Sequence, residues 1–222
     1  MNNSQKMLMA LEEQDLEKAD HYFYKALEQD SSEVLYELAT YLEGIGFYPQ
    51  AKEVYLQIVD VFPEIYLNLA AIASEDGQVE EAFSYLEEIK PDSDFYVSSL
   101  ALKADLYQME GLTDVAREKL LEALKYSDDP LLIFGLAELD SELENYQEAI
   151  QGYAQLDNRL IYEQTGISTY QRIGFAYAQL GKFEVAIEFL EKALELEYDD
   201  HTAYELASLY FDQEEYQKAV LY

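Results

Sequence analysis

Apolar residues recur along the chain at helical spacing, in blocks that short polar turns separate. Seven alanines each follow such a turn and open an apolar run: Ala19, Ala51, Ala82, Ala116, Ala149, Ala186 and Ala219. Successive alanines are 32, 31, 34, 33, 37 and 33 residues apart. A large apolar residue stands four positions after most of them, which places both on one stripe of a helix. The pattern therefore predicts an amphipathic helix in every unit of roughly 33 residues.

A second stripe precedes each of the later alanines by 12 positions, again around a small residue. Its small residues are Ala39, Ala70, Ala104, Ala137, Gly174 and Ala207. Single glycines separate the two stripes in four units, at Gly46, Gly77, Gly111 and Gly181, where a left-handed backbone is easiest for glycine. Two antiparallel helices approach closely only where one side chain is nearly absent. Each unit is therefore predicted to be a helical hairpin with close contact at its small residues.

These units resemble tetratricopeptide repeats, whose pattern of large and small residues has a period of about 34. The sixth unit matches best, through Tyr170, Ile173, Gly174, Tyr177, Gly181, Phe183, Ala186, Leu190 and Ala193. The second unit matches through Leu38, Ala39, Leu42, Gly46, Tyr48, Ala51, Tyr55 and Pro63. The resemblance covers essentially the whole chain, and it implies an all-α, right-handed superhelical solenoid (α-α superhelix) of about seven repeats. The chain is also similar to acidic multi-repeat members of the family from Gram-positive bacteria.

The predicted solenoid is a single domain, residues 1–222. Its repeats are placed at approximately 2–31, 32–62, 63–96, 97–129, 130–166, 167–199 and 200–222. Two features depart from the repeat pattern. Asp140 stands where a buried Tyr or Leu is expected, and the spacing of 37 requires extra residues, which we place in a longer junction over 157–166.

Composition limits the classes of partner. Asp and Glu total 46 against 14 Lys and Arg, so the net charge is −32 and the surface should repel nucleic acids and anionic membranes. The chain has no cysteine, and no apolar run is long enough for a membrane span or a signal-peptide core. We therefore expect a cytoplasmic protein that neither contacts nucleic acid directly nor inserts into a membrane.

No group of residues with catalytic or metal-binding spacing stands out. The two histidines, His21 and His201, lie five repeats apart, and no nucleophile accompanies either. Adjacent carboxylates such as Glu12 and Glu13 point to different faces of a helix, as expected of a solvated acidic surface. Calcium loops and glycine-rich phosphate loops are absent from the sequence. We expect a non-enzymatic protein without a cofactor or a metal.

In the tetratricopeptide family the first helices of successive repeats line a concave groove. The resemblance maps groove positions onto Tyr36, Thr40, Leu67, Ala71, Ala101, Asp105, Phe134, Glu138, Gln171, Phe175, Tyr204 and Ser208. The lining is aromatic and acidic, which favours a protein segment that carries basic residues beside apolar anchors. The alternative for each aromatic residue is packing between neighbouring first helices. The predicted function is a protein-interaction scaffold or adaptor.

Two other functions stay open. One is a self-associating structural module, because the last repeat stops at Tyr222 with an incomplete second helix and solenoids normally end in a polar cap. Either the natural polypeptide continues, or this end pairs with another copy in a homodimer. The other is an acidic mimic of a polyanion that occupies a nucleic-acid-binding protein, which requires regularly spaced carboxylates on one face.

Overall fold

The computed structural model describes residues 1–222 and contains fifteen α-helices and no strand, so the predicted all-α class is confirmed. The chain divides into two compact units, Met1–Ser99 (unit 1) and Leu100–Tyr222 (unit 2). The boundary falls inside helix α7 (Tyr96–Met109). None of the helices combines the length and the apolar character that crossing a bilayer requires.

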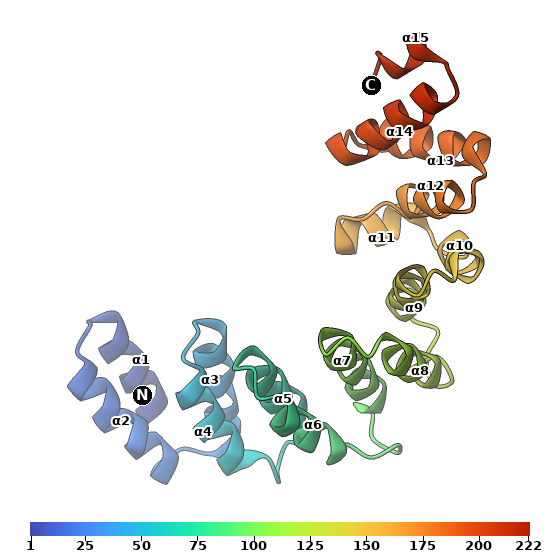
Figure 1. Ribbon diagram of the computed structural model, residues 1–222. Helices are drawn as coiled ribbons and strands as arrows, with labels where there is room; N and C mark the ends of the chain where they lie inside the picture. The colour runs from blue at the N-terminus through green and yellow to red at the C-terminus, as the bar shows by residue number, and fades with distance from the viewer. The chain divides into compact units, whose positions relative to one another are not determined.

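In unit 1, α1 packs on α2, α3 on α4 and α5 on α6, as three successive hairpins (Figure 1). These helices are α1 (Asn3–Glu12), α2 (Leu16–Gln29), α3 (Ser32–Gly44), α4 (Tyr48–Ile58), α5 (Ile65–Glu75) and α6 (Val79–Glu87). Contacts of α3 with α1, and of α5 with α4, join the hairpins. Phe23, Leu35, Tyr55 and Ile65 are buried in one core that runs through these helices.

In unit 2, α9 pairs with α10, α12 with α13 and α14 with α15 (Figure 1). The helices that follow α7 are α8 (Thr113–Ala123), α9 (Pro130–Glu142), α10 (Tyr146–Ala154), α11 (Asn158–Thr165), α12 (Thr169–Gln179), α13 (Phe183–Leu196), α14 (Asp200–Asp212) and α15 (Tyr216–Ala219). Contacts of α8 with α9, α10 with α12 and α13 with α14 continue the stack. Helix α15 has only four residues, none of them buried.

The same turn joins the two helices of each of the seven hairpins. Each turn contains one residue with positive φ, and these residues are Gln14, Gly46, Gly77, Gly111, Glu144, Gly181 and Glu214. The next backbone N–H donates to a carbonyl five residues back, as from Phe47 to Leu42 and from Lys182 to Tyr177. The four predicted glycine turns are confirmed. The other three hairpins place Gln or Glu in a conformation that glycine adopts at lower cost.

Small residues mark close helix contacts, as the sequence predicted. A Cβ atom added to Gly174 of α12 would lie only 2.6 Å from Cδ2 of Leu190 in α13. At Gly152 of α10 the added atom would lie 2.8 Å from Cβ of Ala137 in α9. These hairpins therefore pack at distances that a larger side chain does not fit.

The extra residues between the fifth and sixth hairpins form a helix, where the sequence indicated only a longer junction. Helix α11 begins after Asp157, whose carboxylate accepts a hydrogen bond from the backbone N–H of Leu160, and it ends at Gly166 with φ of 71°. Ile161 is completely buried and packs into the same core as Phe134. The predicted repeat 130–166 thus contains three helices. The aspartate cap and the terminal glycine were the sequence signals for this helix.

Asp140 occupies a buried position of α9, as the repeat register predicted. Its carbonyl accepts the hydrogen bond from Asn145 that closes the turn, as the carbonyl of Tyr177 does in the sixth hairpin. Only 3% of its surface is exposed, and its Oδ1 lies 2.5 Å from Nε of Arg117 in α8. A charge pair therefore replaces the apolar residue of the pattern.

Candidate functional site

The four groove residues predicted in unit 1 lie on α3 and α5. The ring of Tyr36 packs against Phe62 with centroids 5.1 Å apart, so this aromatic residue contributes to packing. Thr40 is exposed, and its hydroxyl donates to the carbonyl of Tyr36 over 3.0 Å. Leu67 and Ala71 are half-buried. This part of the predicted surface offers little charge of its own.

The groove residues predicted on α7 and α9 differ strongly in exposure. Ala101 is half-buried, and Asp105 keeps an exposed surface although the loss of surrounding water raises the pKa of its carboxyl. Phe134 has only 7% of its surface exposed and packs 5.9 Å from the ring of Tyr153. Phe134 is therefore a core residue, and its side chain is not available as a binding anchor.

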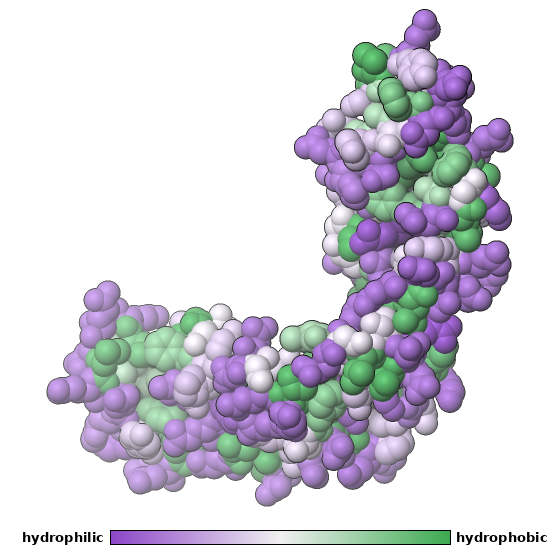
Figure 2. Space-filling model, in the orientation of Figure 1, coloured by the Kyte–Doolittle hydropathy of each residue, from purple (hydrophilic) through white to green (hydrophobic).

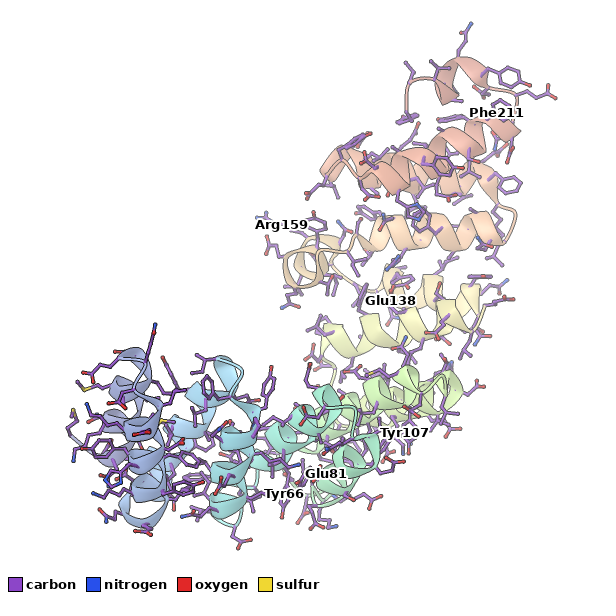
Figure 3. All side chains as sticks on the ribbon, turned by 60° about the vertical axis from the view of Figure 1, so that its left-hand side comes forward. Tyr66, Glu81, Tyr107, Glu138, Arg159 and Phe211 are labelled. Atoms are coloured by element: carbon purple, nitrogen blue, oxygen red, sulfur yellow. The ribbon has the colours of Figure 1, made fainter.

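Glu138 is a residue of α9, labelled in Figure 3, and its carboxylate accepts hydrogen bonds from within the protein. Its Oε1 accepts hydrogen bonds from Nε of Arg172 at 2.9 Å and from the hydroxyl of Tyr153. Burial and the Glu138 charge together raise the pKa of Tyr153 far above its ordinary value, so this phenol stays a donor. The negative charge of Glu138 is therefore largely engaged inside the stack.

In unit 1, the carboxylate of Glu43 connects neighbouring helices in the same way as the carboxylate of Glu138 does in unit 2. Oε2 of Glu43 in α3 accepts from the hydroxyl of Tyr55 in α4 at 2.5 Å and from Nδ2 of Asn68 in α5 at 2.9 Å. In both units a tyrosine of the second helix and a nitrogen donor of the next first helix share one carboxylate. Charged groups thus join successive hairpins, which explains why acidic residues of the first helices are not all free for a partner.

The groove residues predicted on α12 and α14 form the most open part of the predicted surface. The ring of Phe175 lies 5.1 Å from the ring of His201 in a tilted arrangement, and both line a hollow of about 280 Å³ together with Glu205. Tyr204 is 70% exposed, and Ser208 is exposed one turn further along α14. The structure thus brings an aromatic ring, an imidazole and a carboxylate together around one hollow.

The last predicted residue, Gln171, takes part in a different site. Its Nε2 donates to Oδ2 of Asp199 at 2.9 Å and to Oγ1 of Thr202 at 2.6 Å, which ties α12 to the start of α14. Beside it lies a pocket of about 660 Å³ between α11 and the adjoining ends of α12, α13 and α14. The sequence did not predict this pocket, because it indicated only a longer junction over 157–166, where the structure has helix α11.

On the face that Figure 2 shows, the surface is mostly hydrophilic, with separate hydrophobic patches. The structure has no group of three or more His, Cys, Asp or Glu side chains that could hold a metal ion. His21 contacts the neighbouring ring of Tyr22, and His201 belongs to the hollow on α12 and α14.

Comparisons with known proteins support this interpretation of the fold. A model of "YpiA-like, tetratricopeptide repeats" matches residues 108–159, and two tetratricopeptide repeat models match 36–96 and 167–200. The TPR repeat-containing protein YpiA of Bacillus subtilis is 28% identical over 193 residues, which are 85% of this chain and 44% of that protein. The chain therefore spans less than half the length of this relative.

Several solved structures have a similar fold. MamA from Desulfovibrio magneticus superposes with a TM-score of 0.59 and 19% identity, over 71% of this chain and 88% of that one. A tetratricopeptide repeat protein from Parabacteroides merdae gives a TM-score of 0.57 and 21% identity, over 99% and 88%. At such identities the likeness concerns the fold alone. Since tetratricopeptide models match three separate parts of the chain and the hairpins are those of the repeat, this chain belongs to the tetratricopeptide repeat family.

Proposed function

We propose that this chain is a non-enzymatic scaffold or adaptor that binds a protein segment carrying basic residues beside apolar anchors. Tetratricopeptide repeats generally mediate contacts between proteins, and members of the family are typically non-catalytic. The observation that carries the proposal is the hollow lined by Phe175, His201 and Glu205. Tyr204, which precedes Glu205 on α14, is 70% exposed. The segment lies on the first-helix surface of α12 and α14, in the cytoplasm.

The two kinds of contact have different roles in this binding. An aromatic anchor that a partner desolvates contributes about 2 kcal/mol or more, whereas an exposed ion pair contributes at most about 1 kcal/mol and weakens with salt. The net charge of −32 accelerates the approach of a basic segment without deciding its register. Phe134 and Glu138 are not part of this proposed contact, because one is in the core and the other is bonded to Arg172.

A peptide-display selection against the whole chain tests the proposal. Selected peptides should combine Lys or Arg with apolar residues, and Tyr204→Ala should weaken their binding by about thirtyfold. Tyr24→Ala is the matched control, because Tyr24 is 59% exposed on α2, a second helix. Glu205→Gln should chiefly slow association and reduce its salt dependence.

The outcomes separate the proposal from its alternatives. Equal loss of binding in the Tyr204 and Tyr24 variants would move the site away from α14. Selection of purely basic peptides, insensitive to Tyr204→Ala, would favour the acidic mimic of a polyanion. Self-association through residues 200–222 stays a separate prediction. Val220 and Leu221 there are 86% and 78% exposed, and sedimentation of the chain over a range of concentrations tests it.

A further inference from the structure

The pocket beside α11 is distinct from the hollow of the proposed groove. It measures about 660 Å³ and lies where α11, the start of α12, the end of α13 and the start of α14 meet. Pockets of about 300–1,000 Å³ are the size that binds a ligand or several side chains. The pocket exists because α11 stands beside α12 instead of forming a plain connection, so an insertion in the repeat pattern creates it.

One side of the pocket is apolar and open. Leu196 and Tyr198, which follow each other closely at the end of α13, are 62% and 68% exposed. The half-buried ring of Tyr162 in α11 adds a further apolar surface, and Ala193 is small enough to leave space beneath them. This arrangement suits the methylene stem of a long side chain and offers two aromatic faces to a cation.

The other side is acidic, and its carboxylates are held in place. Glu197 accepts a hydrogen bond from the hydroxyl of Tyr162, and Asp199 accepts from Gln171 and from both the hydroxyl and the backbone N–H of Thr202. The bonds from Thr202 keep the pKa of the Asp199 carboxyl below its ordinary value, so it is charged at neutral pH.

Among the residues that line the pocket, no unpaired cation offsets this acidic side. Arg159 lies at the exposed side of α11 (Figure 3). It forms an ion pair with Glu163 at 2.8 Å, and this carboxylate offsets the charge of the guanidinium group. The last turn of α13 carries no basic residue, and the negative end of the helix dipole lies at Leu196 and Glu197. A cation therefore finds an acidic rim, a helix C-terminus and aromatic rings in one place.

We propose that this pocket binds an arginine or lysine side chain of a partner protein segment, with its stem on Leu196 and Tyr198 and its cationic head at Glu197 and Asp199. The inference rests on the proposed function only in that the partner is a basic protein segment. It adds a second contact site, and Gln171 is the only residue that this pocket shares with the predicted groove.

The test uses a small probe and its neutral isostere. The probe is the acetylated, amidated tripeptide Leu-Arg-Leu, and the control probe carries citrulline, which keeps the shape of arginine without its charge. Both are titrated into the ¹⁵N-labelled whole chain while amide shifts are recorded by NMR. The arginine probe should shift the amides of Tyr162, Leu196 and Tyr198 and bind about fivefold more tightly than the citrulline probe.

Two variants locate the contact. Glu197→Gln keeps an acceptor for Tyr162 but removes the charge, and it should weaken binding of the arginine probe by about fivefold. Glu195→Gln is the matched control, because Glu195 is also exposed, lies in the last turn of α13 and does not line the pocket. Equal binding of the two probes, or equal effects of the two variants, would overturn the proposal.

The position of the shifts separates this inference from the proposed function. Shifts confined to the amides of Phe175 and Tyr204 would overturn the proposed binding at the pocket and support binding in the groove. Shifts confined to the pocket amides would support the pocket site and count against the groove. A parallel titration with spermidine tests the other source of a cation. If spermidine shifts the pocket amides and the tripeptide does not, the pocket binds free polyamines and the proposal of a protein side chain is wrong.

Discussion

Asp140 and Arg117 form the most buried ion pair of the chain, with 5% and 29% of their side-chain surfaces exposed. Asn145 adds a weaker hydrogen bond to the same carboxylate oxygen, at 3.4 Å. A buried carboxylate that loses its partner has no access to water, whereas the arginine can still reach solvent. The two residues should therefore respond differently to substitution.

Arg117→Met should lower the free energy of unfolding by about 3 kcal/mol, because it leaves Asp140 charged and unpaired. Asp140→Leu should cost less, since Leu42 shows that leucine fits the equivalent position of the second hairpin. The double variant should recover most of the loss, as a double-mutant cycle in urea unfolding will measure. If the two single effects simply add, the pair is not coupled and the argument is wrong.

Asp30 links the two ends of the first hairpin. Its carboxylate accepts hydrogen bonds from the backbone N–H and hydroxyl of Ser4, both at 2.7 Å, and from the backbone N–H of Asn3. Partial burial works to raise the pKa of Asp30, but these hydrogen bonds outweigh it, and the pKa lies below its ordinary value. The ionised carboxylate therefore stabilises the folded hairpin.

A depressed pKa contributes stability above the unfolded pKa, and the contribution is lost as the pH falls through the folded pKa. Asp30→Asn should thus lower the free energy of unfolding by about 1 kcal/mol at neutral pH. The difference from the parent should shrink as the pH falls below the ordinary aspartate pKa of about 3.9 and through the lower pKa of folded Asp30. Urea unfolding followed by circular dichroism measures both, with Asp20→Asn, an exposed change in α2, the helix that Asp30 follows, as the control. A difference that does not depend on pH would contradict the linkage.

At the scale of the element, the hairpins depend on small residues at the contact between their helices. Gly174 allows α12 to approach α13 so closely that an added methyl group would meet both Cγ and Cδ2 of Leu190, at 2.7 and 2.6 Å. Gly44, near the end of α3, has no atom within 4 Å of such a methyl group. The two glycines are in helices, but only one is required by packing.

Gly174→Ala should lower the free energy of unfolding by about 1–2 kcal/mol, because overpacking outweighs the gain of about 0.5–1 kcal/mol in helix propensity. Gly44→Ala should leave stability unchanged or raise it by that gain. Thermal unfolding of both variants, compared with the parent, gives the contrast. If Gly174→Ala were as stable as Gly44→Ala, the hairpin would have space that the structure does not show.

At the scale of the whole molecule, charge is the dominant imbalance. The ion pairs within the structure, such as Lys52 with Glu81 and Arg172 with Glu138, neutralise only a small part of the acidic excess. A net charge of −32 destabilises a compact chain through repulsion between its carboxylates. Salt weakens repulsion between exposed charges that lie more than a Debye length apart.

Raising the salt concentration from a very low to a physiological value should therefore raise the melting temperature by about 3 °C, which corresponds to about 1 kcal/mol for a chain of this size. Scanning calorimetry in sodium chloride and in sodium thiocyanate at equal, low ionic strength measures the effect. The two salts should act alike if screening is the cause. A melting temperature that does not change with ionic strength would show that the carboxylates are too well solvated to repel each other significantly.

The hairpins could be predicted from the amino-acid sequence, because their causes are local. The period of the small residues, the glycines that allow a left-handed turn and the stripe of apolar residues all act within one or two turns of helix. They predicted Gly46 and Gly181 in the turns and close packing at Gly174, and the structure confirms each. The family followed from the same repetition.

Contacts between helices decide which of the predicted groove residues stay exposed, and the sequence pattern did not reveal these contacts. Phe134 and Tyr204 have similar positions in their repeats, but one is in the core because α10 and α11 supply neighbours for it, and the other has no such cover. Glu138 is engaged because Arg172 reaches it from the next hairpin. The pocket beside α11 likewise depends on two segments, 158–171 and 193–202, that are separated in the sequence. Such contacts arise from side-chain geometry between elements, which the repeat pattern does not encode.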